Sequence, residues 1–204
     1  MADLEPQQRG SAVDEIELAR AHEYTLLSTL LLRSPDADLL QRLRSLRGDE
    51  SALGRAHQAL AEAAARTDAE GVAREYFALF VGLGRGELLP YASYYLTGFV
   101  HGRPLVTLRR DLQRLSIERA DGQSEPEDHA ATLLEVMGAL AGGLVCAPAG
   151  ADRGFFHDHL APWIGRFFSD LERASSAHFY SAVGQLGTTF LEIDRQGFQL
   201  PDSE

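Results

Sequence analysis

The segment Glu125-Pro126-Glu127-Asp128-His129 stands directly before a long run of apolar residues at helical spacing. Proline fixes φ near the helical value and lacks the N–H group that the first turn of a helix would leave unpaired. Carboxylates at Glu127 and Asp128 would then lie where the helix dipole favours negative charge. The segment therefore predicts a helix that begins at Pro126, with an acidic rim and the His129 imidazole one turn in.

This acidic helix start has a structural and a functional interpretation. In the structural one, the carboxylates cap the helix and His129 is a partly buried imidazole. In the functional one, the acidic rim holds a cationic ligand, or Asp128 and His129 act as an acid and a base. Neighbouring residues of a helix point about 100° apart, so these two need not bond each other. A small enzyme of this kind needs a second polar group that converges on the pair, and the sequence offers no clear candidate.

The chain on both sides of this segment carries apolar residues at helical spacing. We expect helices at residues 12–32, 36–46, 51–66, 67–80, 104–119 and 126–141, in short pieces at 152–173, and at 179–193. Residues 88–103 are aromatic and are expected to be irregular, with short helical turns. No segment alternates with period two, so we predict an all-α, single-domain bundle of about 8–11 helices. The domain covers residues 12–198, between a disordered tail at 1–11 and a short tail at 199–204.

The predicted helix at residues 179–193 has the clearest apolar pattern. Its apolar residues are spaced by alternating steps of four and three: Phe179, Val183, Leu186, Phe190 and Ile193. Such a stripe is either the core face of one helix or a coiled-coil seam between two chains. For a single helix of this length we expect the core face.

The charge balance argues against nucleic-acid binding. The 204 residues contain 19 Lys and Arg against 30 Asp and Glu, a net charge of −11. An acidic surface repels phosphate backbones and attracts basic peptides, and the same excess also keeps a protein in solution. The acidic N-terminus, the absence of a long apolar run and the single cysteine predict a cytoplasmic protein with no stable membrane insertion.

The sequence predicts no metal site, no catalytic residues and no cofactor. A single cysteine, Cys146, excludes cysteine-based zinc sites, and we expect it to be buried in its apolar, glycine-rich surroundings. His157 and His159 stand two positions apart, which directs their rings to different faces of a helix. The glycine-rich residues 82–86 have neither a strand before them nor Lys-Ser/Thr after them, so they predict a helix-terminating loop rather than a phosphate loop.

Five blocks of the sequence occur in an order and spacing that is typical of one protein family. They are Tyr76-Phe77-Ala78-Leu79-Phe80-Val81-Gly82, Pro90-Tyr91-Ala92-Ser93-Tyr94, Glu125-Pro126-Glu127-Asp128-His129, His159-Leu160-Ala161-Pro162-Trp163 and Phe179-Tyr180-Ser181-Ala182-Val183-Gly184. In these blocks the chain resembles the TorD/DmsD family of molybdoenzyme chaperones, which is more distantly related to NarJ. The resemblance extends from about Ala19 to Ile193 and is weakest in the N-terminal third.

The resemblance implies an all-helical fold specific to this family, and a chaperone rather than an enzyme. It implies binding to the twin-arginine leader, the apo catalytic subunit, or both, of a molybdopterin oxidoreductase. The chaperone would support insertion of the molybdenum cofactor and delay export of the client precursor. A leaderless cytosolic client, such as a formate dehydrogenase, is the alternative. Carried over by motif, the peptide-binding residues are Tyr76, Leu79, Phe80, Gly82, Tyr91, Tyr94, Pro126, Glu127, Asp128 and His129.

The residue types at these positions suit a leader with a basic start and an apolar middle. Asp128 and Glu127 would receive arginine, and Tyr76, Leu79 and Phe80 would form an apolar groove. An exposed ion pair contributes about 0–1 kcal/mol, whereas each buried apolar side chain contributes about 1.5–3 kcal/mol. A micromolar complex needs about −8 kcal/mol. The groove is therefore expected to provide most of the affinity, and the acids the orientation.

Two departures from the family pattern concern the choice of client. Tyr76 stands where relatives often carry tryptophan, and Gly84-Arg85-Gly86 replaces the bulkier residues of some members. The leader preference of a relative therefore does not transfer to this chain. We expect a monomer or a domain-swapped dimer.

Overall fold

Helices form the regular structure of this protein. The computed structural model describes residues 6–118 and 125–200, and in these ranges it contains ten α-helices, two π-helical segments and no strand. The all-α prediction is confirmed. The elements are α1 (Pro6–Leu32), α2 (Ala37–Arg44), α3 (Ala52–Ala65), α4 (Ala69–Tyr76), the π-helical η1 (Phe77–Val81), α5 (Ala92–Thr97), α6 (Arg103–Arg114), α7 (Ala130–Ala141), α8 (Ala151–Phe155), the π-helical η2 (Phe156–Leu160), α9 (Ile164–Arg173) and α10 (Phe179–Gly197).

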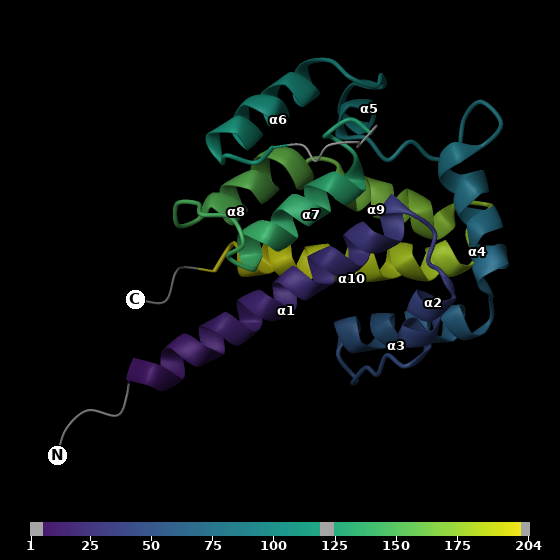
Figure 1. The fold of residues 1–204 in the computed structure, drawn as a ribbon, viewed down its shortest axis with the longest axis horizontal. Helices are drawn as coiled ribbons and strands as arrows, with labels where there is room; N and C mark the ends of the chain where they lie inside the picture. Colours follow the sequence, from purple (N-terminus) through teal and green to yellow (C-terminus); the bar gives the residue numbers. More distant parts are fainter. Residues whose placement is uncertain (1–5, 119–124, 201–204) are drawn as a thin grey trace.

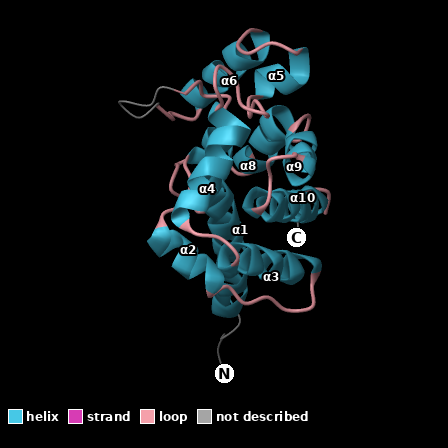
Figure 2. Cartoon of the chain, turned by 90° about the vertical axis from the view of Figure 1, so that its right-hand side faces the viewer, coloured by secondary structure: helices cyan, strands magenta, loops and turns pink. Residues whose placement is uncertain are grey.

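The centre of the molecule is formed by α1, α7, α9 and α10 (Figure 1). Helix α1 packs along α7, and α10 packs against both α9 and α3. In both views α2 and α3 lie on one side of this centre, and α5 and α6 lie on the opposite side (Figures 1 and 2). The fully buried side chains of the core include Tyr24, Leu27, Leu133, Met137, Phe167, Val183 and Leu186.

Local capping signals explain where three of the helices begin. Asp36, Ser51 and Asp68 adopt extended backbone conformations directly before α2, α3 and α4. Each side chain accepts a hydrogen bond from the N–H three residues later, at 2.8, 2.9 and 2.7 Å. Such caps satisfy N–H groups that have no partner within the helix. The predicted starts at these positions are confirmed.

The apolar stripe of α10 forms the core face of that helix. Phe179, Val183, Leu186 and Phe190 are buried, whereas Ile193 is exposed. Helices α9 and α10 approach each other closely at Gly187, where a Cβ atom would lie only 2.3 Å from the Phe168 ring. Only glycine therefore permits this packing distance.

The only tryptophan of the chain, Trp163, links α9 to α5. It is 1% exposed, and its indole N–H donates to the carbonyl of His159 at 2.7 Å. Its ring lies 5.5 Å from the ring of Tyr95 on α5. The indole of Trp163 therefore contacts α5 directly.

Several element boundaries differ from the sequence-based expectation. Helix α1 begins at Pro6, before the predicted start at residue 12. Helix α6 ends at Arg114 instead of residue 119, because Ser116 adopts a positive φ of 55°, which a right-handed helix cannot continue. Cys146 is exposed instead of buried, because it follows the end of α7 in a surface loop. The ends of the predicted tails, residues 1–5 and 201–204, lie outside the described residues.

Candidate functional site

Two segments that are distant in sequence cross where α5 and α7 begin. Tyr91 and His129 form an isolated antiparallel bridge. Two backbone hydrogen bonds of 2.9 and 2.8 Å, between residues 90–92 and residues 128–130, hold the crossing together. The N-terminal ends of α5 and α7 therefore lie side by side, and the second and third family blocks meet there.

Asp128 caps α5 from outside that helix. It is 1% exposed, and its Oδ2 accepts a hydrogen bond of 2.9 Å from the N–H of Ser93, the second residue of α5. Tyr91, which precedes the helix, supplies no side-chain cap, so Asp128 takes this role. Its other oxygen, Oδ1, is buried and has no hydrogen-bond partner. Asp128 is therefore a structural cap that keeps one unused acceptor.

The helix predicted to begin at Pro126 begins at Ala130 instead. Pro126 lies in a turn, in which its carbonyl accepts the N–H of His129 at 3.1 Å. His129 has the extended backbone of an N-cap residue, and its Nδ1 accepts the N–H of Ala131 at 3.1 Å. The tertiary pairing with residues 90–92 thus displaces the helix start, and His129 caps α7 with its own ring.

The imidazole of His129 is neutral at pH 7. The ring is 6% exposed, and this burial lowers the pKa of His129 to about 4, against the weaker opposing charges of Glu125 and Asp128. Because Nδ1 accepts a hydrogen bond, the proton of the neutral ring is on Nε2. The Asp128 carboxylate is directed to Ser93 and not to this ring, so the acid and base pair considered above does not form.

Tyr91 connects this corner to Glu125, the first residue of the motif. The Tyr91 hydroxyl donates a hydrogen bond to Oε2 of Glu125, and the Tyr91 ring packs edge-on against His129 at 5.2 Å. Burial and the hydrogen bond to Glu125 raise the pKa of Tyr91. Glu125 itself is exposed. The motif therefore begins with a solvent-facing carboxylate that a tyrosine orients.

Tyr76 lies close enough to Glu125 for the negative charge of that carboxylate to affect the pKa of Tyr76. Burial, and then the Glu125 carboxylate, raise the pKa of Tyr76. The Tyr76 hydroxyl donates to the carbonyl of Leu32 at 3.0 Å, at the C-terminal end of α1. Its ring packs against Phe80 at 5.1 Å and Tyr180 at 5.9 Å. Tyr76 thus joins the end of α1 to the corner formed by Tyr91 and Glu125.

The predicted groove residues on η1 have different environments. Leu79 has no exposed surface and belongs to the hydrophobic core, so it does not line a groove in this conformation. Phe80 is half-buried and packs against the core. On the same segment Phe77 and Val81 are 44% and 49% exposed, and Leu83 in the following loop is 99% exposed. These three residues give the segment after Tyr76 an exposed apolar surface, and none of them was among the predicted peptide-binding residues.

Gly82 ends η1 as the glycine-rich sequence predicts. Its φ is +62°, and a Cβ atom there would lie 2.0 Å from the carbonyl oxygen of Arg85. The loop therefore requires glycine at this position for its conformation and for the close approach of its backbone. Arg85 at the loop donates to the Tyr94 hydroxyl at 3.0 Å and lies over its ring at 5.5 Å. Tyr94 is thus partly covered by a cation of the chain itself.

Glu127 is paired with a cation on α6. Arg109 Nε lies 3.1 Å from both Glu127 oxygens, and Arg109 Nη2 lies 2.8 Å from Oε2. Such a two-pronged pair fixes the carboxylate in orientation as well as in charge. Glu127 is therefore already paired with a cation of the chain itself.

The structure brings together only part of the predicted peptide-binding set. Tyr76, Tyr91, Asp128 and His129 share one neighbourhood through the contacts described above, and Leu79 lies in the core. Glu125, which opens the motif, lies in the same neighbourhood but was not among the predicted peptide-binding residues. The signal that distinguishes Glu125 from Glu127 is the pairing with Arg109, which no local pattern reveals.

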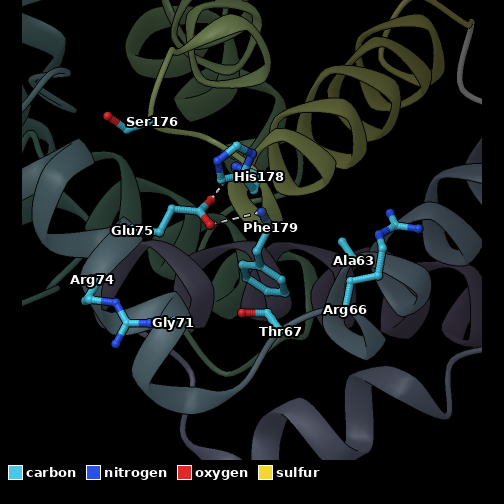
Figure 3. A pocket seen from close by; sticks show the side chains of 9 residues that line it. All are labelled: Ala63, Arg66, Thr67, Gly71, Arg74, Glu75, Ser176, His178 and Phe179. Carbon is cyan, nitrogen blue, oxygen red and sulfur yellow. Dashed lines mark hydrogen bonds between the residues drawn. The ribbon is translucent and has the colours of Figure 1, made fainter.

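A separate cavity of about 510 Å³ lies between α3, α4 and the start of α10 (Figure 3). Arg66 and Arg74 stand on either side of the Phe179 ring in this view. The Glu75 carboxylate accepts the backbone N–H groups of residues 178, 179 and 180 at 2.8, 3.1 and 2.7 Å, and so caps α10. None of the described residues that line the cavity belongs to the predicted peptide-binding set.

The described residues contain neither a metal-binding cluster nor a membrane-spanning helix. Within residues 6–118 and 125–200, no group of three or more His, Cys, Asp or Glu side chains is arranged to hold a metal ion. Over the same described ranges, no helix combines the length and the apolar character needed to cross a membrane.

The chain is similar to known chaperones over most of its length. It is 27% identical over 198 residues to the chaperone protein TorD of Vibrio cholerae serotype O1, covering 86% of this chain and 90% of that protein. It is 29% identical over 202 residues to the chaperone protein TorD of Shewanella oneidensis, covering 89% of this chain and 91% of that protein. These relatives are chaperones by name, which agrees with the expectation of a chaperone rather than an enzyme.

The fold and the family agree with this similarity. A crystal structure described as a redox enzyme maturation protein from Archaeoglobus fulgidus has the same fold, with a TM-score of 0.59 and 21% sequence identity. The alignment covers 85% of this chain and 93% of that one. The sequence model of the family described as nitrate reductase delta subunit matches residues 47–169. Because this match covers more than half of the chain, the protein belongs to the nitrate reductase delta subunit family, as do the TorD chaperones that it resembles.

Proposed function

We propose that this protein is a cytoplasmic chaperone for a molybdopterin oxidoreductase. It binds the twin-arginine leader of the catalytic subunit, or the apo subunit itself, supports insertion of the molybdenum cofactor and delays export. The family match and the TorD relatives support the chaperone role. The geometry of the corner where α5 and α7 begin supports the binding of a basic leader.

One observation carries the proposal for the leader. Residues 90–92 cross residues 128–130, and the exposed carboxylate of Glu125 accepts a hydrogen bond from Tyr91 there. After burial, the charge of Glu125 also contributes to the raised pKa of Tyr76. The segment that continues from Tyr76 carries the exposed apolar side chains of Phe77 and Val81. A leader with a basic group followed by an apolar stretch would match this acidic residue and the exposed apolar side chains beyond Tyr76.

The apolar surface is expected to supply most of the affinity. Burying the exposed parts of Phe77, Val81 and Leu83 would contribute about 1.5–3 kcal/mol for each fully covered side chain. One partly exposed ion pair adds about 0–1 kcal/mol. The acidic corner therefore sets orientation and encounter rate, and raising the salt concentration should weaken binding only modestly.

The test is co-purification from the native host. The tagged protein is recovered from cells in which cofactor synthesis is blocked, and its partners are identified by mass spectrometry. We expect the precursor of a molybdopterin oxidoreductase with its leader intact. Arg74→Ala, which changes the separate cavity, serves as a control that should recover the same precursor.

The same experiment distinguishes a client with a leader from one without. A precursor whose leader is deleted should be recovered in much smaller amounts if the leader is the main ligand. Equal recovery without the leader indicates recognition of the apo subunit, as for a leaderless client. Recovery of no molybdopterin oxidoreductase in either form contradicts the proposed function.

A further inference from the structure

The three carboxylates of the motif differ in what they contact. Glu127 is engaged on both oxygens by Arg109. Asp128 is buried and caps α5 through Oδ2. Glu125 is exposed, and its partner is the neutral hydroxyl of Tyr91. In the part of the chain that the structure describes, Glu125 is thus the one motif carboxylate that faces solvent without a cation.

We propose that Glu125 is the carboxylate that receives an arginine of the leader, and that Asp128 is a positioning residue that holds α5 and Tyr91 in place. This assignment rests on the proposed function and names the binding chemistry of the same site. It differs from the motif-based expectation, in which Asp128 and Glu127 met the arginine.

Tyr91 orients the Glu125 carboxylate and leaves acceptor positions open for a guanidinium group. An ionised carboxylate has about four lone-pair directions, and the Tyr91 hydroxyl uses one of them on Oε2. The remaining directions accept the two parallel N–H groups of an arginine side chain. The rings of Tyr91 and Tyr76 lie near this charge, and a planar guanidinium stacks on such rings whereas a lysine ammonium does not. The site should therefore prefer arginine to lysine.

The buried oxygen of Asp128 is an independent sign that the corner favours a cation. Oδ1 is buried without a hydrogen-bond partner, so a second donor does not offset the charge of this carboxylate. That charge reaches Tyr91 and adds to the charge of Glu125 there. The adjacent imidazole of His129 is neutral and does not offset either carboxylate. The exposed carboxylate of Glu125 and the buried carboxylate of Asp128 thus both act on Tyr91.

The experiment measures peptide affinity by isothermal titration calorimetry. The first probe is a synthetic peptide with two adjacent arginines followed by an apolar stretch of about 10 residues. In the second probe both arginines are lysines. Wild type should bind the arginine peptide about tenfold more tightly than the lysine peptide, as expected for one bidentate contact worth about 1.4 kcal/mol.

Two isosteric variants of the same motif provide the contrast. Glu125→Gln should lose this preference and bind both peptides equally. Glu127→Gln has the same change two positions later and should keep the preference within about twofold, because its carboxylate is already paired. A Glu125→Gln variant that still prefers arginine as strongly as wild type overturns the assignment.

A second pair of variants tests the positioning role. Asp128→Asn retains a carbonyl that can cap α5, so the ratio of arginine to lysine affinity should survive even where both affinities fall. Asp128→Ala lacks the cap and should lose the ratio as well. Equal ratios in these two variants overturn the positioning role. If the wild-type protein binds neither peptide, the proposed leader binding is wrong. If it binds the arginine peptide and Glu125→Gln keeps the preference for arginine, only the assignment of Glu125 is wrong.

Discussion

Histidine precedes both α7 and α10, yet the two helix starts are capped in different ways. His178 is exposed and makes no cap. Glu75 on α4 accepts three backbone N–H groups in its place, of which Figure 3 shows those of His178 and Phe179. His129 is buried and caps α7 with its own ring. Its neighbour Asp128 is then left to cap α5.

The two capping carboxylates, of Glu75 and Asp128, differ in the number of hydrogen bonds that they accept. Glu75 accepts hydrogen bonds on both oxygens, whereas Asp128 accepts on one oxygen and keeps Oδ1 without a partner. Both carboxylates also act on a nearby tyrosine. Burial is the main cause that raises the pKa of Tyr180 and of Tyr91, and the charges of Glu75 and Asp128 add to it. The two caps therefore differ in the number of hydrogen bonds that each carboxylate accepts.

The largest effect is expected from Glu75→Gln. The amide nitrogen of Gln would face a backbone N–H that now donates to an oxygen, and the charge at the start of α10 would be lost. We expect the free energy of unfolding in urea to fall by about 2–3 kcal/mol. Glu70→Gln on the exposed face of α4 is the control and should cost less than about 0.5 kcal/mol. A Glu75→Gln variant as stable as this control would show that the cap is not needed.

The next effect is the dependence of stability on pH at His129. Burial lowers the pKa of His129 from 6.5 to about 4, so below pH 6.5 the unfolded chain binds a proton that the native state does not. Stability from this group is present above pH 6.5 and is lost as the pH falls towards 4. Between pH 7 and 5 the loss is about 2 kcal/mol. His129→Asn, which keeps a capping side chain, should remove this part of the pH dependence in urea unfolding.

His57 provides a control of opposite sign for that measurement. It lies 2.8 Å from Glu23, and this hydrogen bond raises the pKa of His57. Its contribution to stability is present below pH 6.5 and is lost as the pH rises through the folded-state value. His57→Asn should therefore steepen the loss of stability on acidification. Identical pH profiles for the two variants would contradict the buried, neutral state of His129.

The smallest effect on stability is expected from Asp128→Asn. Its carbonyl can still accept the N–H of Ser93, and its amide nitrogen replaces an atom that has no partner. We expect the free energy of unfolding to change by less than about 1 kcal/mol. A loss as large as that of Glu75→Gln would mean that Oδ1 is hydrogen-bonded in solution, and the contrast between the two caps would disappear.

The helices could be predicted from the sequence because their signals are local. Asp36, Ser51 and Asp68 stand directly before helices and accept the N–H three residues later, and the stripe of α10 repeats at helical spacing. The start of α7 could not be predicted in this way, because the local preference of Pro126 for a first helical turn competes with the tertiary bridge at His129. The π-helical register of residues 77–81 also has no local signal, since its apolar sequence suits an α-helix equally well.

The sequence motifs named several residues that the structure brings together, but not what each of them contacts. Tyr91 and His129, which belong to different motifs, meet where α5 and α7 begin. The partner of Asp128 lies 35 residues away, and the partner of Glu127 lies 18 residues away. These long-range pairs decide which carboxylate is buried, which is neutralised and which remains exposed. No spacing rule within the motif contains that information.

The contact between Trp163 and Tyr95 gives this protein an internal optical reporter. The chain has one tryptophan, and it touches the helix that Asp128 caps. Its emission should therefore respond to a shift of α5 without any added label. A stopped-flow fluorescence trace can therefore test whether a bound peptide moves α5, and can time any change in emission against the heat of binding.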